Sequence, residues 1–547
     1  MLVNNLLERI TDYLLPTKIV QSENVLDSEW LLKCADEQIY IMAHGGCTIK
    51  SGGYIILDFG KELHGGIRIL NSLCDDNSGK QNIRIRFGES VAETCSDIGV
   101  INSTNDHSPR DMTVCIPMLS DLEFGQTGFR FVRIDNLSTY DYKLVSVQAA
   151  YKHLKVMPKG YFKCDDKLVN EIYDTAAHTL FLCMQNRLWD GIKRDRLVWL
   201  GDMHPEVRGI FSLYGEHPLI ELGLSESTLY NPLPGWMSSA PSYSIWWLNI
   251  LCDYEWNTDK WEFIKTQLDY AYGVIEQIDR CVDDNGNIDY LAIGLPTGYG
   301  FFLNWETRYE EGLESGNRGL LLCTLNKFIS MASRHGVKFD TALKIVNKLN
   351  KKQIFEGKSK SVAALYSMGY GINEDAKRIL TSGGAKGFST FMSSYIADAI
   401  ADCHSGELAL KDMKDFYAGM LSRGATSFWE SYDPDWLIGS GRIDKLPEQN
   451  EKDIHSSFGD HCYVGFRLSL CHGWACGPVP FLSERALGVK FKSAGGSTVE
   501  IKPDLMGLKK VEGAYPTPYG LVEVEHKQTE SGVESKVKLP SGITRLS

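Results

Sequence analysis

The sequence predicts a multidomain β plus all-α protein: an N-terminal β-sandwich, a central closed helical domain and a small C-terminal β-sandwich. Short apolar or alternating runs, separated by turn residues, fill roughly the first 150 positions and are typical of antiparallel sheets. Apolar residues at helical spacing dominate from there to about residue 480, and strand-like alternation returns from about residue 486. We therefore expect domains at residues 1–155, 156–483 and 484–547.

The N-terminal region holds four clear strand candidates. Residues 83–87, Ile-Arg-Ile-Arg-Phe, alternate apolar and charged side chains, which indicates a sheet with one face in water. The other three candidates are residues 54–60, 129–134 and 142–147. Several short strands of this kind favour an antiparallel sandwich.

The middle of the chain reads as helical. Apolar residues at 168, 172, 176, 180 and 183 fall on one face of a helix. Further candidates are residues 204–215, 241–256, 260–280, 307–334, 338–351, 389–402, 406–422 and 456–473. For so many helices without intervening strands, the economical closed arrangement is an α/α barrel or toroid. Alternation in residues 499–501, 521–524 and 533–539 then predicts the C-terminal sandwich.

Composition excludes several classes of protein. The hydrophobic fraction of 43% and charged fraction of 23% are those of a soluble globular chain of 547 residues. A net charge of −13 argues against a nucleic-acid partner. The sequence contains no apolar stretch of about eighteen residues, so we predict no membrane span. The N-terminus lacks the features of a signal peptide, so we expect a cytoplasmic protein unless a leader has been removed. A homodimer is left open.

Neither a metal nor a cofactor is predicted. The sequence contains no His-Glu-x-x-His run, no Cys-x-x-Cys pair and no phosphate-binding glycine loop. Its 14 cysteines are irregularly spaced, which favours free, reduced thiols.

Four segments mix tryptophan with acids or histidine near expected helix ends: residues 189–206, 304–311, 424–436 and 469–477. The first fits neither helical nor strand periodicity, which indicates an irregular loop. Carboxylates among tryptophans suit a sugar, because acids bind hydroxyls and indole faces cover the apolar side of the ring. Glycoside hydrolysis also needs two carboxyl groups, one protonated. The four segments together predict a carbohydrate enzyme.

Three motifs resemble those of the α-L-rhamnosidases of glycoside hydrolase family 78. Residues 190–202, Asp-Gly-Ile-Lys-Arg-Asp-Arg-Leu-Val-Trp-Leu-Gly-Asp, are similar to the family's Asp-Cys-Pro-x-Arg-(Asp)-Glu-Arg-x-Gly-Trp-x-Gly-Asp. Residues 424–430 look like its Gly-Ala-Thr-Thr-x-Trp-Glu, and residues 469–472 like its Ser-Leu-Asn-His. Upstream, residues 57–60, 86–89 and 128–133 resemble the β-sandwich of that family.

The resemblance implies an inverting exo-glycosidase, built on an (α/α)6 barrel, that releases terminal α-L-rhamnose from glycosides or oligosaccharides. It places the general acid on Asp195 and the general base on Glu430. It implies the substrate-binding residues Asp190, Arg194, Trp199, Asp202, Trp305, Trp429 and His472.

One residue departs from the family pattern: the acid position usually holds Glu, and this chain has Asp195. The carboxyl is withdrawn by about 1.5 Å, one carbon–carbon bond. A misplacement of that size costs about a hundredfold in rate unless the backbone compensates. A shifted loop, a different acid such as Glu206 or Asp202, and a different leaving group are the competing explanations.

Two other functions stay open at this point. Another α/α-barrel glycosidase or lyase would act on fucose or a uronate, and Lys193, Arg194 and Arg196 offer charge for neutralising a uronate. A non-catalytic glycan-binding protein would use the sandwiches for binding and the helices as a scaffold.

Overall fold

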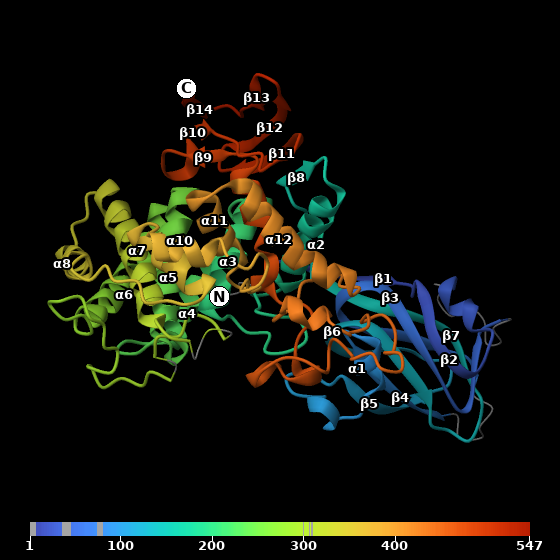
Figure 1. Ribbon diagram of the computed structural model, residues 1–547. Coiled ribbons are helices and arrows are strands. Elements are labelled where there is room, and N and C mark those ends of the chain that lie inside the picture. Colours follow the sequence, from blue (N-terminus) through green and yellow to red (C-terminus); the bar gives the residue numbers. More distant parts are fainter. Residues whose placement is uncertain are drawn as a thin grey trace. The chain divides into compact units, whose positions relative to one another are not determined.

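The structure is a computed structural model (Figure 1), which describes residues 7–34, 45–73, 80–298, 300–305, 307 and 310–546. It has a sheet-rich N-terminal region, a helical middle and a small C-terminal sheet region. The chain divides into two compact units. The first comprises residues 1–155, 181–196 and 419–472, and the second comprises residues 156–180, 197–418 and 473–547. Two later segments therefore pack with the N-terminal sheet, and the domain boundaries drawn from the sequence stay a prediction.

The first unit is built on a sheet of order β1-β7-β3-β6-β4-β5, with β2 paired to β3. Its pairs are antiparallel except β3 with β7, which is parallel. The strands are β1 (Arg9–Leu14), β2 (Lys18–Leu26), β3 (Cys47–Asn71), β4 (Lys80–Gly88), β5 (Asp111–Pro117), β6 (Asp121–Asn136) and β7 (Tyr142–Leu154). The four strands predicted in this region are confirmed within β3, β4, β6 and β7.

The core of this unit explains why the later segments belong to it. Apolar side chains from alternate positions of the strands form one buried cluster. Leu182, Cys183, Ile192 and Cys471 are fully buried members of the same cluster. The loops that carry the sequence motifs are therefore fixed by the core of this sheet.

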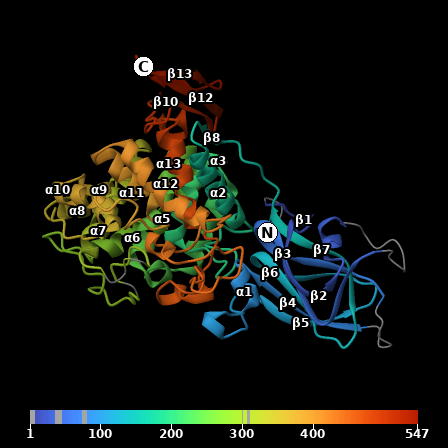
Figure 2. The same cartoon turned by 45° about the vertical axis from the view of Figure 1, so that its right-hand side comes forward.

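The second unit contains helices whose mutual contacts run in a cycle. Within its described part, α3 packs on α5, α5 on α7, α7 on α9, α9 on α11, α11 on α13, and α13 on α3. Figure 2 shows several of these helices side by side. The helices are α2 (Lys167–Cys183), α3 (Leu200–Leu213), α4 (Pro218–Tyr230), α5 (Pro241–Thr258), α6 (Trp261–Asp279), α7 (Leu313–Arg334), α8 (Asp340–Leu349), α9 (Lys360–Tyr370), α10 (Glu374–Leu380), α11 (Ser393–Cys403), α12 (Gly406–Ser422) and α13 (Pro478–Arg485).

Most expected helices are confirmed, and one is wrong. Residues 456–473 form no α-helix: they contain 3-10 turns at His461–Tyr463 and Gly465–Arg467, and another begins at Gly473. Gly459 and Gly465 adopt positive φ angles of 98° and 64°, which interrupt a right-handed helix. None of the helices in the described part of the chain combines the length and hydropathy that crossing a membrane requires.

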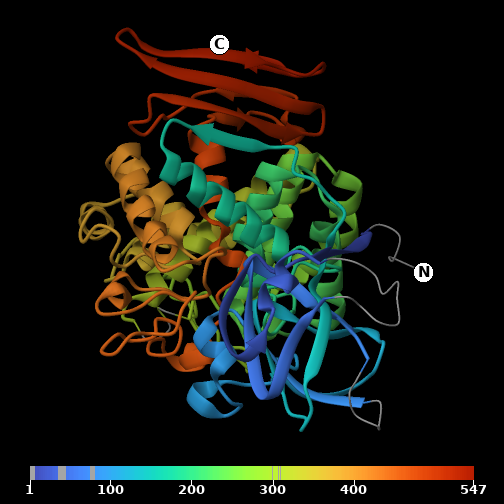
Figure 3. The ribbon, with the colours of Figure 1, turned by 90° about the vertical axis from the view of Figure 1, so that its right-hand side faces the viewer.

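The C-terminal region forms two small sheets, of order β14-β10-β9 and β13-β12-β11-β8. Strand β8 (Tyr161–Cys164) precedes α2 in the sequence and pairs antiparallel with β11, as Figure 3 shows beside the red C-terminal strands. The other strands are β9 (Val489–Phe491), β10 (Thr498–Ile501), β11 (Lys510–Thr517), β12 (Gly520–Thr529), β13 (Gly532–Lys538) and β14 (Thr544–Leu546). The three strands predicted here are confirmed.

Candidate active site

Arg194 joins the two carboxyl groups that the sequence singles out. Its Nη2 donates to both carboxylate oxygens of Glu430 at 2.8 Å, and its Nη1 donates to Oδ1 of Asp195 at 3.2 Å. Its Nε donates to the carbonyl of Arg467 at 2.8 Å. Arg194 and Glu430 are 236 positions apart in the sequence. A single buried guanidinium thus brings together the two predicted catalytic residues.

The loop that carries Arg194 has an unusual backbone. Asp195 and Arg196 are both left-handed, with φ angles of 51° and 54°. Such angles cost energy for residues other than glycine and are retained where the surroundings impose them. Gly128 on β6 makes the loop's approach possible, because a Cβ there would lie 2.7 Å from Cγ1 of Ile192 and 2.9 Å from the amide nitrogen of Lys193.

Glu430 is almost fully buried, with 3% of its surface exposed. Burial raises the pKa of its carboxyl group, while Arg194 and the backbone N–H of Ser469, which donates to Oε2 at 3.1 Å, oppose the rise. The net direction is upward. A carboxylate whose pKa is raised accepts a proton more readily than an exposed one, which suits a general base.

His472 and Asp190 lie beside this pair. Nε2 of His472 is 3.6 Å from Oε1 of Glu430 and 3.8 Å from Oδ2 of Asp190. Burial, together with the charge of Arg194, holds the pKa of His472 well below its usual range, so its ring is neutral at neutral pH. The structure therefore brings together five of the nine predicted site residues: Asp190, Arg194, Asp195, Glu430 and His472.

Trp429 belongs to the same unit but is fully buried. Its ring packs edge-on against Tyr432, with 5.8 Å between centroids. A direct contact with a sugar would require this side chain to move, and its role in substrate binding stays a prediction.

The other three predicted residues lie in the second unit, around Tyr243 at the start of α5. The hydroxyl of Tyr243 donates to Oδ1 of Asp202 at 3.3 Å. Its ring packs edge-on against Trp199 and Phe302, and Phe302 packs against Trp305. Sequence reasoning missed Tyr243 and Phe302, because neither lies in a recognised motif. The binding roles of Trp199, Asp202 and Trp305 stay predictions.

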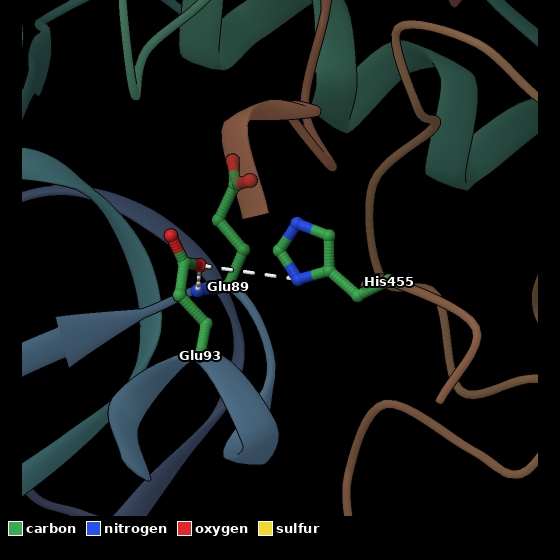
Figure 4. Close-up of side chains that lie close together, drawn as sticks. All are labelled: Glu89, Glu93 and His455. Atoms are coloured by element: carbon green, nitrogen blue, oxygen red, sulfur yellow. Dashed lines mark hydrogen bonds and ion pairs between the residues drawn. The ribbon is translucent and has the colours of Figure 1, made fainter. Parts of the chain in front are cut away.

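A network of buried charges supports the loops of the first unit. Lys193 donates to the carboxylate of Glu89 at 3.2 Å and lies 2.9 Å from that of Glu93. Figure 4 shows the side chains of Glu89, Glu93 and His455 lying close together, with the carboxylate of Glu93 facing the ring of His455. Burial raises the pKa of Glu89 to about 7 and lowers that of His455 to about 4.

These three side chains also have the spacing of a metal site. Both ring nitrogens of His455 already have hydrogen-bond partners: Nδ1 lies next to the hydroxyl of Ser90, and Nε2 lies 2.9 Å from the carbonyl oxygen of Leu468. The ammonium group of Lys193 already supplies the positive charge between the two carboxylates. The donor set therefore fits a metal ion poorly.

Glu89 reaches Glu430 through one intervening residue. Its carboxylate accepts from the hydroxyl of Ser469 at 3.1 Å and from the backbone N–H of Leu470 at 2.6 Å. Ser469 is the residue whose own N–H donates to Glu430. The upstream motif that ends at Glu89 thus holds the segment that contacts the predicted base.

A second upstream pair holds the segment before Glu430. Arg130 and Asp58 form a buried bidentate ion pair, with both contacts at 2.8 Å. Nη1 of Arg130 also donates to the carbonyl of Gly424 at 2.9 Å. Both residues come from the sandwich motifs recognised in the sequence.

A cavity of about 510 Å³ lies elsewhere, in the second unit, and none of the nine predicted residues lines it. Its charged residues form ion pairs, among them Lys327 with Asp253 and Arg208 with Glu484. Size alone therefore does not mark the candidate site.

Comparisons with known proteins place this architecture among solved α-L-rhamnosidases. A structure from Bacillus sp. GL1, described as a GH78 family rhamnosidase, matches with a TM-score of 0.70 and 19% identity over 94% of this chain and 56% of its own. A Klebsiella oxytoca rhamnosidase with rhamnose bound matches with a TM-score of 0.65 and 17% identity over 88% and 96% of the two chains. A Streptomyces avermitilis α-L-rhamnosidase complexed with L-rhamnose matches with a TM-score of 0.67 and 13% identity over 91% and 50%.

The chain therefore spans about half the length of the Bacillus and Streptomyces proteins and nearly all of the Klebsiella one. Among curated proteins, no sequence matches. Residues 488–545 match the family described as "Bacterial alpha-L-rhamnosidase C-terminal domain". The chain thus has the fold of the α-L-rhamnosidases and ends in a region that matches their C-terminal domain.

Proposed function

We propose that this protein is an inverting exo-glycosidase that hydrolyses terminal α-L-rhamnosides. The observation that carries the proposal is the contact of one guanidinium, that of Arg194, with both Asp195 and Glu430. The fold of solved rhamnosidases and the match of residues 488–545 support it.

The two carboxyl groups have unlike surroundings, which suits unlike roles. Both oxygens of Glu430 accept from Nη2 of Arg194, which leaves neither oxygen free to carry a proton, so this carboxyl is ionised and acts as the base. Asp195 accepts from Arg194 through one oxygen only. Asp195 is the more exposed of the two, with 21% of its side chain accessible. It donates a proton to the glycosidic oxygen while Glu430 draws one from the attacking water.

The two carboxyl groups are close enough to act on one sugar. Because both groups bind Arg194, their carboxylates lie no farther apart than one guanidinium and two hydrogen bonds. That span is below the upper end of the roughly 6.5–9.5 Å that inverting glycosidases use to admit a water.

We also propose that the helical middle is an (α/α)6 barrel. The cyclic contacts of α3, α5, α7, α9, α11 and α13 support an inner ring of helices. The helices between them in sequence would form the outer ring, as contacts of α4, α6 and α8 with their neighbours support.

No observation favours a uronate lyase. Lys193 is paired with Glu89 and Glu93, and Arg194 is paired with Glu430, so neither contributes net positive charge for a uronate. A lyase would also leave an unsaturated product with ultraviolet absorbance, which hydrolysis does not produce.

A panel of aryl glycosides, with proton NMR following the anomer first released, tests the reaction. We expect turnover of the α-L-rhamnoside and initial appearance of β-L-rhamnose. Initial release of the α-anomer would contradict inversion, and preference for a fucoside or a uronide would contradict the sugar.

The base assignment has its own test. Glu430→Gln keeps the size of the side chain but removes the proton acceptor, so we expect kcat to fall by roughly 10²–10⁴-fold with rhamnose affinity retained. Kinetics and calorimetric titration with rhamnose measure the two quantities. Most of the activity surviving in this variant would place the base elsewhere.

Two further proposals concern the intact protein. We propose a cytoplasmic location, tested by cell fractionation, and a homodimer as an option, tested by light scattering in solution.

A further inference from the structure

Asp195 is held entirely through one of its two oxygens. Oδ1 accepts from Nη1 of Arg194 at 3.2 Å and lies 3.3 Å from Nε2 of His107. Within the described residues, Oδ2 takes part in no hydrogen bond. This asymmetry matters for an acid, because a protonated carboxyl carries its hydrogen on one oxygen and accepts on the other.

His107 belongs to the loop between α1 (Val91–Cys95) and β5, not to any motif of the catalytic segments. Its carbonyl accepts from Nη2 of Arg196, the residue next to Asp195. Nη1 of Arg196 donates to the carbonyl of Gln126 at 3.0 Å, and the hydroxyl of Ser108 donates to the same carbonyl at 2.9 Å. The side chain of Arg196 therefore fastens the residue after Asp195 to the His107 loop and to the carbonyl of Gln126.

The loop is also fastened to the segment that Arg194 binds. Asp106 forms an ion pair with Nη1 of Arg467 at 2.6 Å. The carbonyl of Arg467 accepts from Nε of Arg194. The charged groups around His107 are thus Asp106, Asp195, Arg194, Arg196 and Arg467, and they form one closed set of contacts.

We propose that His107 is a positioning residue for Asp195. Nε2 of His107 and the guanidinium of Arg194 fix Oδ1, so that the acidic proton resides on Oδ2 and faces the leaving oxygen. The left-handed backbone at Asp195 and Arg196, with φ of 51° and 54°, fixes the position of the same carboxyl group. The inference rests on the proposed function.

The proton step balances without any further reactant. The Oδ2–H bond of Asp195 breaks as a bond forms between that hydrogen and the glycosidic oxygen, whose bond to the anomeric carbon breaks. Asp195 is left as a carboxylate, which Arg194 and His107 stabilise through Oδ1. His107 itself exchanges no proton with the substrate.

Two substitutions of equal polarity test the role. The amide of Gln reaches the position of Nε2 of histidine, whereas the amide of Asn stops at the position of Nδ1. We expect His107→Asn to lower kcat roughly tenfold to a hundredfold on a rhamnoside with a sugar leaving group, with KM unchanged. We expect His107→Gln to retain most of the activity.

The leaving group separates positioning from folding. A dinitrophenyl rhamnoside needs little proton donation, so His107→Asn should lower its kcat by less than about threefold. Equal losses on both substrates, or equal behaviour of the Asn and Gln variants, would overturn the inference. The exposed His404→Asn serves as the control.

The proposed function fails in a different way. A wild-type enzyme inactive on every rhamnoside overturns both the function and this inference. An active wild-type enzyme with an unchanged His107→Asn variant overturns only the inference. Circular dichroism of each variant verifies that it is folded.

Discussion

Arg194 is a residue that lysine cannot replace. Its planar fork binds both oxygens of Glu430 and a second carboxyl group at the same time. A lysine ammonium is one point charge and lacks this geometry. We expect Arg194→Lys to lower kcat/KM by roughly a hundredfold, because both carboxyl groups lose their orientation.

The charge of Arg194 also sets the pH range over which Glu430, the proposed base, can accept a proton. Arg194 opposes the rise that burial imposes on the pKa of Glu430. In Arg194→Gln that opposition is lost, so the pKa of Glu430 rises further and the acidic limb of the kcat/KM profile moves to higher pH. An unmoved limb would show that another group acts as base. Arg442→Gln, at the partly exposed pair with Asp444, is the control.

At the scale of elements, the N-terminal sheet supports the loops that carry Arg194 and Glu430. The Asp58–Arg130 pair connects β3 and β6 to the segment before Glu430. We expect Asp58→Asn to reduce the free energy of unfolding by about 3–5 kcal/mol, because it leaves a buried guanidinium without its charge partner. Urea unfolding of the first unit measures the loss.

The control for this prediction is Glu8→Gln. Glu8 and Lys155 form an ion pair in the same unit, but their side chains are 65% and 61% exposed. Removing such a pair costs at most about 1 kcal/mol. Similar losses in both variants would contradict the anchoring role of Asp58.

The periodicity of apolar residues predicted most strands and helices correctly. It failed where contacts between residues distant in the sequence determine the backbone conformation. In β4, apolar and charged side chains alternate over residues 83–87, although Arg86 on the charged face is buried. Helices such as α5 and α6 match their predicted ranges closely. Residues 456–473 have apolar spacing but form loops, in which Gly459 and Gly465 interrupt a helix and the carbonyls of Phe466 and Leu468 accept from Lys193. That partner lies 273 and 275 positions away. No local pattern reveals it.

At the scale of the whole molecule, the sequence motifs predicted five site residues that lie close together, but they did not predict the side chains that contact those residues. Asp190, Arg194, Asp195, Glu430 and His472 stand in recognisable runs that the fold brings together. His107 and Tyr243 lie outside the recognised motifs. They contact Asp195 and Asp202, from which they are distant in the sequence. A single sequence reveals the motifs, but it does not reveal which distant side chains contact them.

Buried histidines contribute to the loss of stability in acid, and His217 allows one such contribution to be measured. Burial lowers the pKa of His217 to about 4, with a smaller contribution from the charge of Lys159. The unfolded chain takes up a proton near pH 6.5, whereas the folded chain does so only near pH 4. The stability that His217 contributes is therefore complete above about pH 6.5 and is lost as the pH falls toward 4.

His217→Asn isolates this effect. His217 caps α4 by accepting the backbone N–H of Leu219 at Nδ1, and asparagine is among the preferred residues at a helix N-cap. We expect equal stability at pH 7.5 and a gain of about 2–3 kcal/mol over the wild type at pH 4.5, since each pKa unit is worth about 1.4 kcal/mol. Denaturant unfolding followed by the helical circular dichroism signal measures both, with the exposed His404→Asn as the control. If the variant loses stability in parallel with the wild type, protonation of His217 is not part of acid unfolding.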